Sequence, residues 1–392
     1  MPASGGTRSG PSVEHRTRRR DGSQTRVAPR RPLQAARLRH PPRTWRYGVT
    51  FPYLELSDDC LSPLRGSAGG IADRERRYPS PVRSLLLIAN PAASRFTGGL
   101  HRSVVLRLSR AYEVETVWPT SAGEVEARAL QAAHDGVDIV AAMGGDGVVH
   151  HVVNGICDTR ATLGIIPAGT TNVLARILGI PARPGRAAAY LASGPPAIYA
   201  PLAQISLDTG AGTTVRYATF ATGVGFDAEA VRVSNLEPYR KYWFGGIHYA
   251  RSAVGVVLSR DNRQPPNMRV DDGERSVNAA AVLVQVHDPY TYFGRVPLRV
   301  SRRPHTGLAA LLVERLTLPR IPAILAAAIT GRNLERIPGV HVWEDVRQID
   351  VHAEPPSPLQ ADGELLGAVD SVRFSARPRG LRVVAPTAPV NE

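Results

Sequence analysis

The sequence predicts an α/β fold in which an open parallel-sheet domain is followed by a β-rich, sandwich-like domain. Between residues 82 and 192, short apolar runs alternate with helical segments, which is the pattern of strands joined by crossover helices. From residue 197 onward, apolar and polar residues alternate, as in an antiparallel sheet with one solvated face. Two runs of the first half end in small-residue loops that precede a helix, and parallel sheets place ligands at such loops.

The first of these loops reads Gly144-Gly145-Asp146-Gly147 and lies between the apolar run 137–142 and a helix expected over 148–156. Glycine allows the backbone to approach a ligand closely, and a helix start offers unpaired N–H groups to an anion. Phosphate is therefore the expected ligand. The Asp146 carboxylate is suited instead to a magnesium ion, a water network or a substrate hydroxyl. Taken alone, the loop is explained equally well as a strand-to-helix turn with a polar cap.

The second loop follows the apolar run 163–166 and contains Gly169, Thr170 and Asn172 before another helical segment. It repeats the order of strand, small polar loop and helix. Because the carboxyl ends of parallel strands meet at one edge of a sheet, both loops are expected to converge on a single crevice.

These two motifs resemble those of the diacylglycerol kinase catalytic family, which includes bacterial lipid kinases and the related sphingosine and ceramide kinases. Three further segments match the family in the same order, namely 88–91 (Ile-Ala-Asn-Pro), 223–228 (Gly-Val-Gly-Phe-Asp-Ala) and 362–364 (Asp-Gly-Glu). The resemblance covers residues 82–385. Any single motif is a weak signal, but five in order are a strong one.

The resemblance implies an ATP-dependent lipid kinase that uses magnesium and phosphorylates diacylglycerol or a related lipid alcohol in phospholipid metabolism. It assigns removal of the hydroxyl proton to Glu364 or Asp362, with Asp146 as the rival base and the tentative metal ligand. The nucleotide-binding residues that it implies are Asn90, Pro91, Thr120, Gly144, Gly145, Asp146, Gly147, Val148, Gly169, Thr170 and Asn172. Thr120 is equally well explained as the N-cap of a helix over 124–133.

The resemblance also divides the chain into domains. It implies a nucleotide-binding domain over 81–200, a β-rich domain over 201–380 with a lipid cleft at the interface, and a final strand with a short tail over 381–392. The residues implied to line the cleft are Gly223, Gly225, Phe226 and Asp227. A strand-end bend with a capping aspartate is the simpler explanation of these four, just as a hairpin turn is for Asp362-Gly363.

The chain departs from the family pattern at three places. The family usually has threonine after Gly-Gly-Asp-Gly, where this chain has Val148. It usually has asparagine and glutamate where this chain has His150 and His151. An Asp-Gly pair that helps to bind a magnesium ion is replaced by Thr306-Gly307, and the glycine-rich segment before it reads 292–295 (Tyr-Phe-Gly-Arg). Adjacent histidines point in different directions on a helix, so a metal site at 150–151 is disfavoured.

The formal net charge is +14, and residues 1–80 hold 16 arginines against 7 acidic residues without hydrophobic periodicity. Such a segment buries too little apolar surface to offset the entropy of ordering, so a disordered Arg/Pro-rich tail is expected. The tail suits an anionic membrane leaflet or nonspecific nucleic-acid binding. It is also explained as a solvated extension, or as the product of a start codon assigned too early.

Two distant cysteines, Cys60 and Cys157, argue against a disulfide scaffold and fit a reducing cytoplasm. No stretch is long and apolar enough to span a bilayer. We therefore expect a cytoplasmic protein that lies peripherally at the inner face of the membrane. The aromatic and basic segment 239–246 is a candidate membrane contact, although a helix packed on the sheet explains it more simply.

The expected partners are ATP, a lipid alcohol and an anionic membrane surface, with no specific nucleic acid; a homodimer is one candidate for the oligomeric state, which the sequence leaves open. Two alternatives to a lipid kinase also remain open. The departures at Val148 and His151 favour a nucleotide- or lipid-binding homologue with weak catalysis. The Gly-Gly-Asp-Gly loop is shared with NAD kinases, but the missing Asn-Glu pair disfavours that activity. No Walker lysine pattern is present, so a P-loop kinase is excluded.

Overall fold

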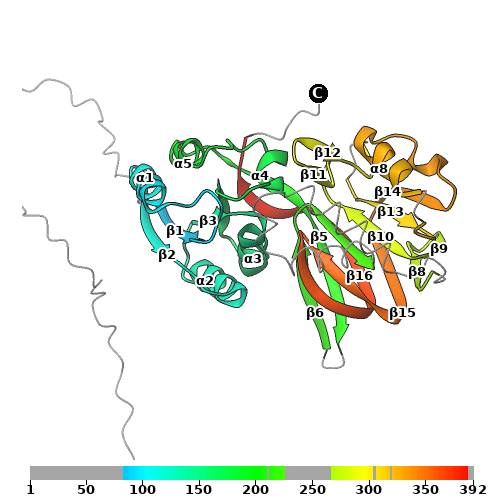
Figure 1. Cartoon of the computed structure of the whole chain (residues 1–392). Helices are drawn as coiled ribbons and strands as arrows, with labels where there is room; N and C mark the ends of the chain where they lie inside the picture. The colour runs from blue at the N-terminus through cyan, green and yellow to red at the C-terminus, as the bar shows by residue number, and fades with distance from the viewer. Residues whose placement is uncertain (1–82, 210–211, 226–265, 303–305, 318–319, 387–392) are drawn as a thin grey trace, which may run out of the picture. The chain divides into compact units, whose positions relative to one another are not determined.

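The computed structural model describes residues 83–209, 212–225, 266–302, 306–317 and 320–386 (Figure 1). The chain divides into two units, Met1–Arg74 and Glu75–Glu392, and every described residue belongs to the second unit. Among these residues, no helix is both long and apolar enough to cross a membrane. Three segments with predicted roles, 1–80, Phe226–Asp227 and 239–246, lie outside the described residues.

The first half of the described chain is a parallel sheet with helices between its strands. The strand order is β2-β1-β3-β4, and every neighbouring pair is parallel. The central strands are fully buried because both faces are covered, which explains their continuous apolar sequences. In chain order the elements are β1 (Arg83–Ala89), α1 (Gly98–Leu108), β2 (Tyr112–Val117), α2 (Ala122–His134), β3 (Ile139–Gly144), α3 (Asp146–Ile156), β4 (Thr162–Pro167), α4 (Val173–Ile177) and α5 (Pro184–Ala192).

The second half is rich in antiparallel strands. The order β14-β13-β10-β7-β15-β16 forms its main path, while the hairpins β5-β6 and β8-β9 branch from β16 and β15. The elements are β5 (Ala197–Thr209), β6 (Gly212–Ala218), β7 (Ala221–Gly225), β8 (Met268–Asp271), β9 (Ser276–Ala279), β10 (Ala281–Gln285), β11 (Thr291–Phe293), β12 (Val296–Leu298), β13 (Leu308–Val313), α8 (Arg320–Thr330), the 3-10 helix η1 (Leu334–Arg336), β14 (Val340–Val346), β15 (Gln348–Ala361) and β16 (Glu364–Val384).

Strand β16 connects the two halves through hydrogen bonds. Most of its length pairs with β15 and β5, and near its end Val383 pairs in parallel with Leu163 of β4. Two apolar cores follow from this arrangement. One contains the parallel sheet and its helices, and the other lies wholly among strands of the second half, around Phe374 and Met268. The predicted fold class, an α/β parallel sheet followed by a β-rich region, is confirmed.

Several element boundaries differ from the sequence prediction. Helix α3 begins at Asp146, two residues before the expected start, so the aspartate lies in its first turn. The final strand expected over 381–392 is the end of a longer strand, β16, which begins at Glu364 and ends at Val384. A register shift in the β15–β16 pairing between His352 and Ser357 accommodates the prolines of β15, which otherwise signal a break. Helix α8 was not expected, because its sequence is apolar on all sides and gives no amphipathic period.

Candidate active site

The loops after β1, β3 and β4 lie side by side at one edge of the parallel sheet. Ala89, the last residue of β1, pairs with Met143 of β3, and Gly144 pairs with Pro167 at the end of β4. The chain leaves β1 toward β2 on one side and returns to β3 on the other, so the strand order reverses between β1 and β3. Open parallel sheets bind ligands at such a reversal. The predicted convergence of the two motif loops is therefore present.

The two glycine loops are in van der Waals contact through their backbones. A methyl group built on Gly169 would lie 2.5 Å from the Cα of Gly145, so a larger residue at 169 would push the loops apart. Backbone N–H groups of Ala168 and Gly169 donate to Gly144 O at 2.8 and 3.1 Å. The Asn172 side chain closes the second loop, because its Oδ1 accepts from Gly169 N at 3.0 Å and its Nδ2 donates to Gly169 O at 2.8 Å.

Asn172 is thus buried and folds back on its own loop, in a left-handed conformation with φ 50°. Thr170 is exposed, and its hydroxyl donates to Ser94 Oγ at 3.2 Å in the loop after β1. Asn90 Oδ1 accepts from Ala92 N at 2.8 Å and so shapes that first loop, while Asn90 N donates to Met143 O. Of the predicted nucleotide residues, Asn172 shapes the Gly169 loop, whereas Thr170 is exposed.

Thr120 is committed to helix capping. Its N–H and its hydroxyl both donate to Glu124 Oε2, at 2.9 and 3.0 Å. The N-cap of α2 is Ser121, whose hydroxyl accepts from Glu124 N, so the alternative that Thr120 is the N-cap is wrong by one residue. Glu124 is thus hydrogen-bonded to both residues that precede helix α2. A nucleotide contact by Thr120 stays a prediction.

Asp146 lies half-buried at the first position of α3, and its Oδ1 accepts from Leu174 N at the start of α4 at 3.4 Å. Burial, and after it the negative charge of Asp362, raise the pKa of Asp146 to about 7, although backbone hydrogen bonds from α4 oppose the rise. A carboxylate with this environment gains from a nearby cation. The described residues contain no group of three or more His, Cys, Asp or Glu that could hold a metal by themselves. Asp146 therefore fits a magnesium site in which one carboxylate is a ligand and substrate phosphates and water supply the other ligands.

Glu364 reaches the glycine turn from the far end of the sequence. It is the first residue of β16, and a methyl group built on Gly147 would lie 2.5 Å from Glu364 Oε1. A side chain at residue 147 would therefore have to displace the Glu364 carboxylate. Val148, next to it, is buried and packs on Gly144, where a methyl group would lie 2.8 Å from Val148 Cγ2. The glycine turn thus meets the Glu364 carboxylate in addition to its own Asp146, and Val148 contributes no hydroxyl.

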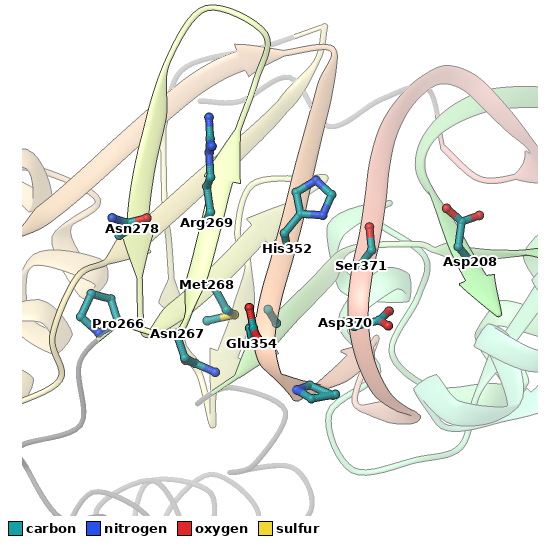
Figure 2. Close-up of a pocket in the computed structure, with 12 residues that line it drawn as sticks. Asp208, Pro266, Asn267, Met268, Arg269, Asn278, His352, Glu354, Asp370 and Ser371 are labelled. Carbon is teal, nitrogen blue, oxygen red and sulfur yellow. The ribbon is translucent and has the colours of Figure 1, made fainter. Parts of the chain in front are cut away.

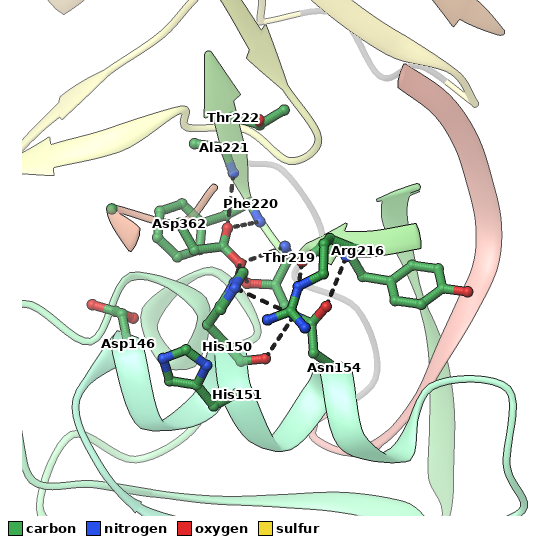
Figure 3. A network of polar contacts seen from close by, with 12 residues as sticks. Asp146, His150, His151, Asn154, Arg216, Thr219, Phe220, Ala221, Thr222 and Asp362 are labelled. Carbon is green, nitrogen blue, oxygen red and sulfur yellow. Dashed lines mark hydrogen bonds and ion pairs between the residues drawn. The ribbon is translucent and has the colours of Figure 1, made fainter. Parts of the chain in front are cut away.

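Asp362, two residues before Glu364, is a fully engaged buried carboxylate (Figure 3). Its Oδ1 accepts from the N–H groups of Phe220 and Ala221, at 2.9 and 3.2 Å. Its Oδ2 accepts from Thr219 N at 2.7 Å and Thr219 Oγ1 at 3.0 Å, and lies 3.0 Å from His150 Nδ1. The turn itself is tight, with positive φ at Asp362 and Gly363. Asp362 is therefore placed to hold the turn in position, and the choice of the base among Glu364, Asp362 and Asp146 stays a prediction.

His150 connects helix α3 to that turn. Its ring is fully buried, with Nδ1 against Asp362 and Nε2 3.3 Å from Asn154 Nδ2 (Figure 3). Asn154 in turn donates to Tyr217 O and accepts from Tyr217 N, which fixes the end of β6. Asp146, His150 and Asn154 follow one another at intervals of four residues and so share one helix face. That spacing was the available signal for this network in the sequence, and it was not used in the prediction.

His151 points elsewhere, as expected for adjacent helical residues. Its Nδ1 lies 2.8 Å from Glu126 Oε1, and Glu126 is also held by Arg216. Burial raises the pKa of Glu126, but the hydrogen bonds from His151 and Arg216 outweigh it and bring the pKa to about 2. This half-buried group joins α2, α3 and β6 on the side away from Asp362.

The predicted cleft residues Gly223 and Gly225 lie inside β7, which pairs with β10 on one side and β15 on the other. Gly225 has φ 83°, and a methyl group on it would lie 2.8 Å from Met268 Cε and 2.9 Å from Ala280 O. Both glycines are buried, so their described environment is structural. Phe226 and Asp227 lie outside the described residues, and the lipid cleft stays a prediction.

A separate open cavity of about 980 Å³ lies on the β-rich half (Figure 2). Its walls come from β5, β8, β9, β15 and β16 and include Arg269, His352 and Asp370. None of the residues predicted to bind nucleotide or to carry catalysis lines it. The glycine loops, where the predicted residues lie, are therefore the candidate active site.

Comparison with known proteins supports that choice. The sequence pattern of the diacylglycerol kinase catalytic domain matches residues 84–197, the segment that contains the glycine loops. These residues are similar to diacylglycerol kinase catalytic domains. A diacylglycerol kinase of Bacillus subtilis is 43% identical over 99 residues, which cover 24% of this chain and 33% of that protein. A diacylglycerol kinase of Staphylococcus aureus is 24% identical over 316 residues, 78% of this chain and 93% of that one.

A solved structure of a diacylglycerol kinase from Bacillus anthracis superposes with a TM-score of 0.57 at 17% identity and covers 80% of this chain and 100% of that one. At this identity the likeness concerns the fold alone. The chain thus shares the fold over both halves and the kinase family's sequence pattern over the first.

The third departure from the family pattern, at Thr306-Gly307, has a carboxylate next to it in the structure. Asp345, in β14, stands opposite Thr306-Gly307. Its Oδ1 accepts from Thr306 N, Thr306 Oγ1 and Gly307 N at 3.0, 3.0 and 2.8 Å. A carboxylate from another strand is therefore held by hydrogen-bond donors of the Thr306-Gly307 loop. The altered segment also has a partner, since Arg176 of α4 donates to Gly294 O and stacks 3.5 Å from the Tyr292 ring centroid.

Proposed function

We propose that this protein is an ATP-dependent lipid kinase that phosphorylates the hydroxyl of diacylglycerol or a related lipid alcohol. The observation that carries the proposal is the Glu364 carboxylate lying directly over Gly147. A carboxylate at the glycine turn of a kinase-family domain is placed to receive a proton from a hydroxyl that attacks a phosphate held by that turn. The lipid acceptor rests on the relatives named diacylglycerol kinase.

In the proposed reaction, backbone N–H groups at the start of α3 and in the Gly169 loop bind the triphosphate. The lipid hydroxyl oxygen attacks the γ-phosphorus while its proton passes to Glu364. The bond from the γ-phosphorus to the β–γ bridging oxygen breaks, and ADP leaves with that electron pair. A magnesium ion, held by Asp146 together with the phosphates, supplies neutralisation of the triphosphate charge when it is bound. Asp362 and His150 hold the turn that carries Glu364 in place.

The second candidate is a nucleotide- or lipid-binding homologue with weak catalysis. One observation favours it: the buried Val148 side chain packs against Gly144, so the helix start lacks the hydroxyl that the family usually has there. Loss of one polar contact to a phosphate lowers transition-state stabilisation without removing the binding site.

The test is phosphate transfer from labelled ATP, with magnesium, to a panel of lipid alcohols in mixed micelles. We expect labelled lipid from the wild type and strongly reduced labelling from Asp146→Ala and Glu364→Ala. Glu335→Ala serves as the matched control. Glu335 is an exposed glutamate of η1 and is not among the predicted site residues, so this variant should keep full activity. Equal labelling by wild type and Glu364→Ala would refute the assigned base. ATP binding without any lipid product would favour the binding homologue.

A further inference from the structure

Helix α8 exposes an apolar face to solvent. Its sequence from Ile321 to Thr330 contains no ionisable residue, and none of the helix residues is buried. Ile324 and Ala327 pack inward against the first core. The opposite stripe, at helical spacings of three and four residues, consists of Pro322, Leu325, Ala326 and Ile329, and all four are exposed. A helix that is apolar on both faces normally has a partner on each.

A neighbouring strand extends the same surface. Helix α8 packs against β12, and Arg299 N donates to Ala328 O at 2.8 Å next to that strand. Val296 of β12 is 38% exposed, close to the values of 42% for Leu325 and 40% for Ile329. Single exposed apolar residues need no explanation, but Leu325 and Ile329 lie one turn apart on α8, and β12, which contacts this helix, exposes Val296; such a gathering of exposed apolar residues is of the kind used for binding. Strand β12 pairs with β11, whose Tyr292 contacts Arg176 of α4, so the β11–β12 hairpin links the patch to the helix that follows the Gly169 loop (Figure 1).

The surroundings of this helix are strongly basic. Residues 295–339 contain eight arginines against two glutamates, a net charge of +6. Residues 1–80 account for +9 of the total of +14. The residues outside both 1–80 and 295–339 therefore carry a net charge of about −1. Five of these eight arginines are described and exposed: Arg295, Arg302, Arg315, Arg332 and Arg336. The Arg302 side chain lies at the carboxyl end of α8, where a methyl group on Gly331 would come within 2.7 Å of its Cγ.

We infer that α8 and β12 form a docking surface for an anionic lipid bilayer. An exposed apolar stripe flanked by arginines is the composition of helices that lie in the membrane interface, where apolar side chains enter the acyl boundary and cations meet the headgroups. Nucleic acid would match the charge, but it gives no reason for exposed leucine and isoleucine at the centre of the patch. The inference rests on the proposed function only in that a lipid substrate requires access to a membrane.

The test is sedimentation of the full chain with vesicles of phosphatidylglycerol and phosphatidylcholine in equal parts, without ATP. We expect the double variant Leu325→Asp/Ile329→Asp to bind at least about tenfold more weakly than the wild type. The matched control, Leu106→Asp/Leu130→Asp, introduces the same charges at exposed leucines of α1 and α2 and should bind as the wild type does. Arg302→Gln/Arg332→Gln should weaken binding by about tenfold and reduce its sensitivity to salt. Thermal unfolding should show that all variants remain folded.

Several outcomes would overturn the inference. Unchanged vesicle binding by Leu325→Asp/Ile329→Asp would place membrane contact on another part of the chain. A dimer of the wild type that this variant dissociates, with vesicle binding unchanged, would make the face an interface between two copies. Binding that is equal for pure phosphatidylcholine vesicles would remove the role of the arginines. Because this assay contains no ATP, vesicle binding through α8 by a protein that transfers no phosphate would sustain the docking surface and refute the kinase proposal.

Discussion

Asp362 and Glu364 are two carboxylates separated by one glycine, and they have opposite environments. Asp362 accepts four hydrogen bonds from residues 219–221 and meets His150, whereas Glu364 lies over Gly147 at the mouth of the glycine turn. A carboxylate whose oxygens are all engaged is a poor proton acceptor, because accepting a proton would break hydrogen bonds that stabilise the fold. One turn therefore carries both an anchoring carboxylate, Asp362, and the carboxylate that we propose as the base, Glu364.

Exchanging each carboxylate for its amide should separate the two roles. We expect Glu364→Gln to lower kcat by about 10²–10⁴-fold with little change in thermal stability, since it removes a proton acceptor at the turn. We expect Asp362→Asn to cost about 2–4 kcal/mol of unfolding free energy, since buried donors lose their acceptor. Steady-state kinetics and denaturant unfolding of both variants measure the difference. A stable, fully active Glu364→Gln variant would reverse our assignment.

The space over Gly147 provides a sharper test of where Glu364 lies. A side chain at residue 147 would collide with the carboxylate, so Gly147→Ala should displace it and lower kcat/KM by about 10–100-fold. Gly123 is the matched control, because it occupies the same second position of helix α2 and a methyl group there meets nothing within 4 Å. Gly123→Ala should therefore keep its activity. Equal activity of the two variants would show that Glu364 does not occupy this space.

The two adjacent histidines extend the comparison to helix α3. His150 is buried against Asp362, so His150→Ala should destabilise the protein by about 2–3 kcal/mol and lower kcat more than it changes KM for ATP. His150→Asn, which retains a donor, should recover part of both losses. His151→Ala breaks only a half-buried contact with Glu126 and should cost about 1 kcal/mol or less. Similar losses for both alanine variants would remove the positioning role of His150.

The pH dependence of folding tests the environment of Asp146. Its pKa is raised to about 7 in the folded protein, above its ordinary value of 3.8. Its contribution to stability is therefore complete below about pH 4 and is lost as the pH rises through about 7. The unfolding free energy of the wild type should fall between pH 5 and pH 8. We expect Asp146→Asn to make this fall smaller by about 1–2 kcal/mol, a value discounted for the partial exposure of Asp146. Denaturant unfolding at several pH values measures it, and an unchanged pH profile would contradict the raised pKa.

The sequence by itself determined much of the first half. Local periodicity located the strands and helices of the parallel sheet, and the shared edge of parallel strands predicted that the loops at Gly144 and Gly169 converge. Both inferences need only short-range patterns and a general rule of sheet geometry. The resemblance carried by these loops to the diacylglycerol kinase family is likewise legible in the sequence, because phosphate-binding backbone requires particular small residues at fixed spacing.

Tertiary structure alone decided the rest. Only the folded chain brings Glu364 over Gly147 and Asp362 against His150, because these pairs are more than 200 residues apart and no local pattern encodes their contact. The position of α8 was hidden for a related reason: an apolar run reads the same whether its second face is covered or exposed. Side-chain chemistry sets what a residue is able to do, but the neighbours that the fold supplies decide whether a carboxylate anchors a turn or is free to take a proton.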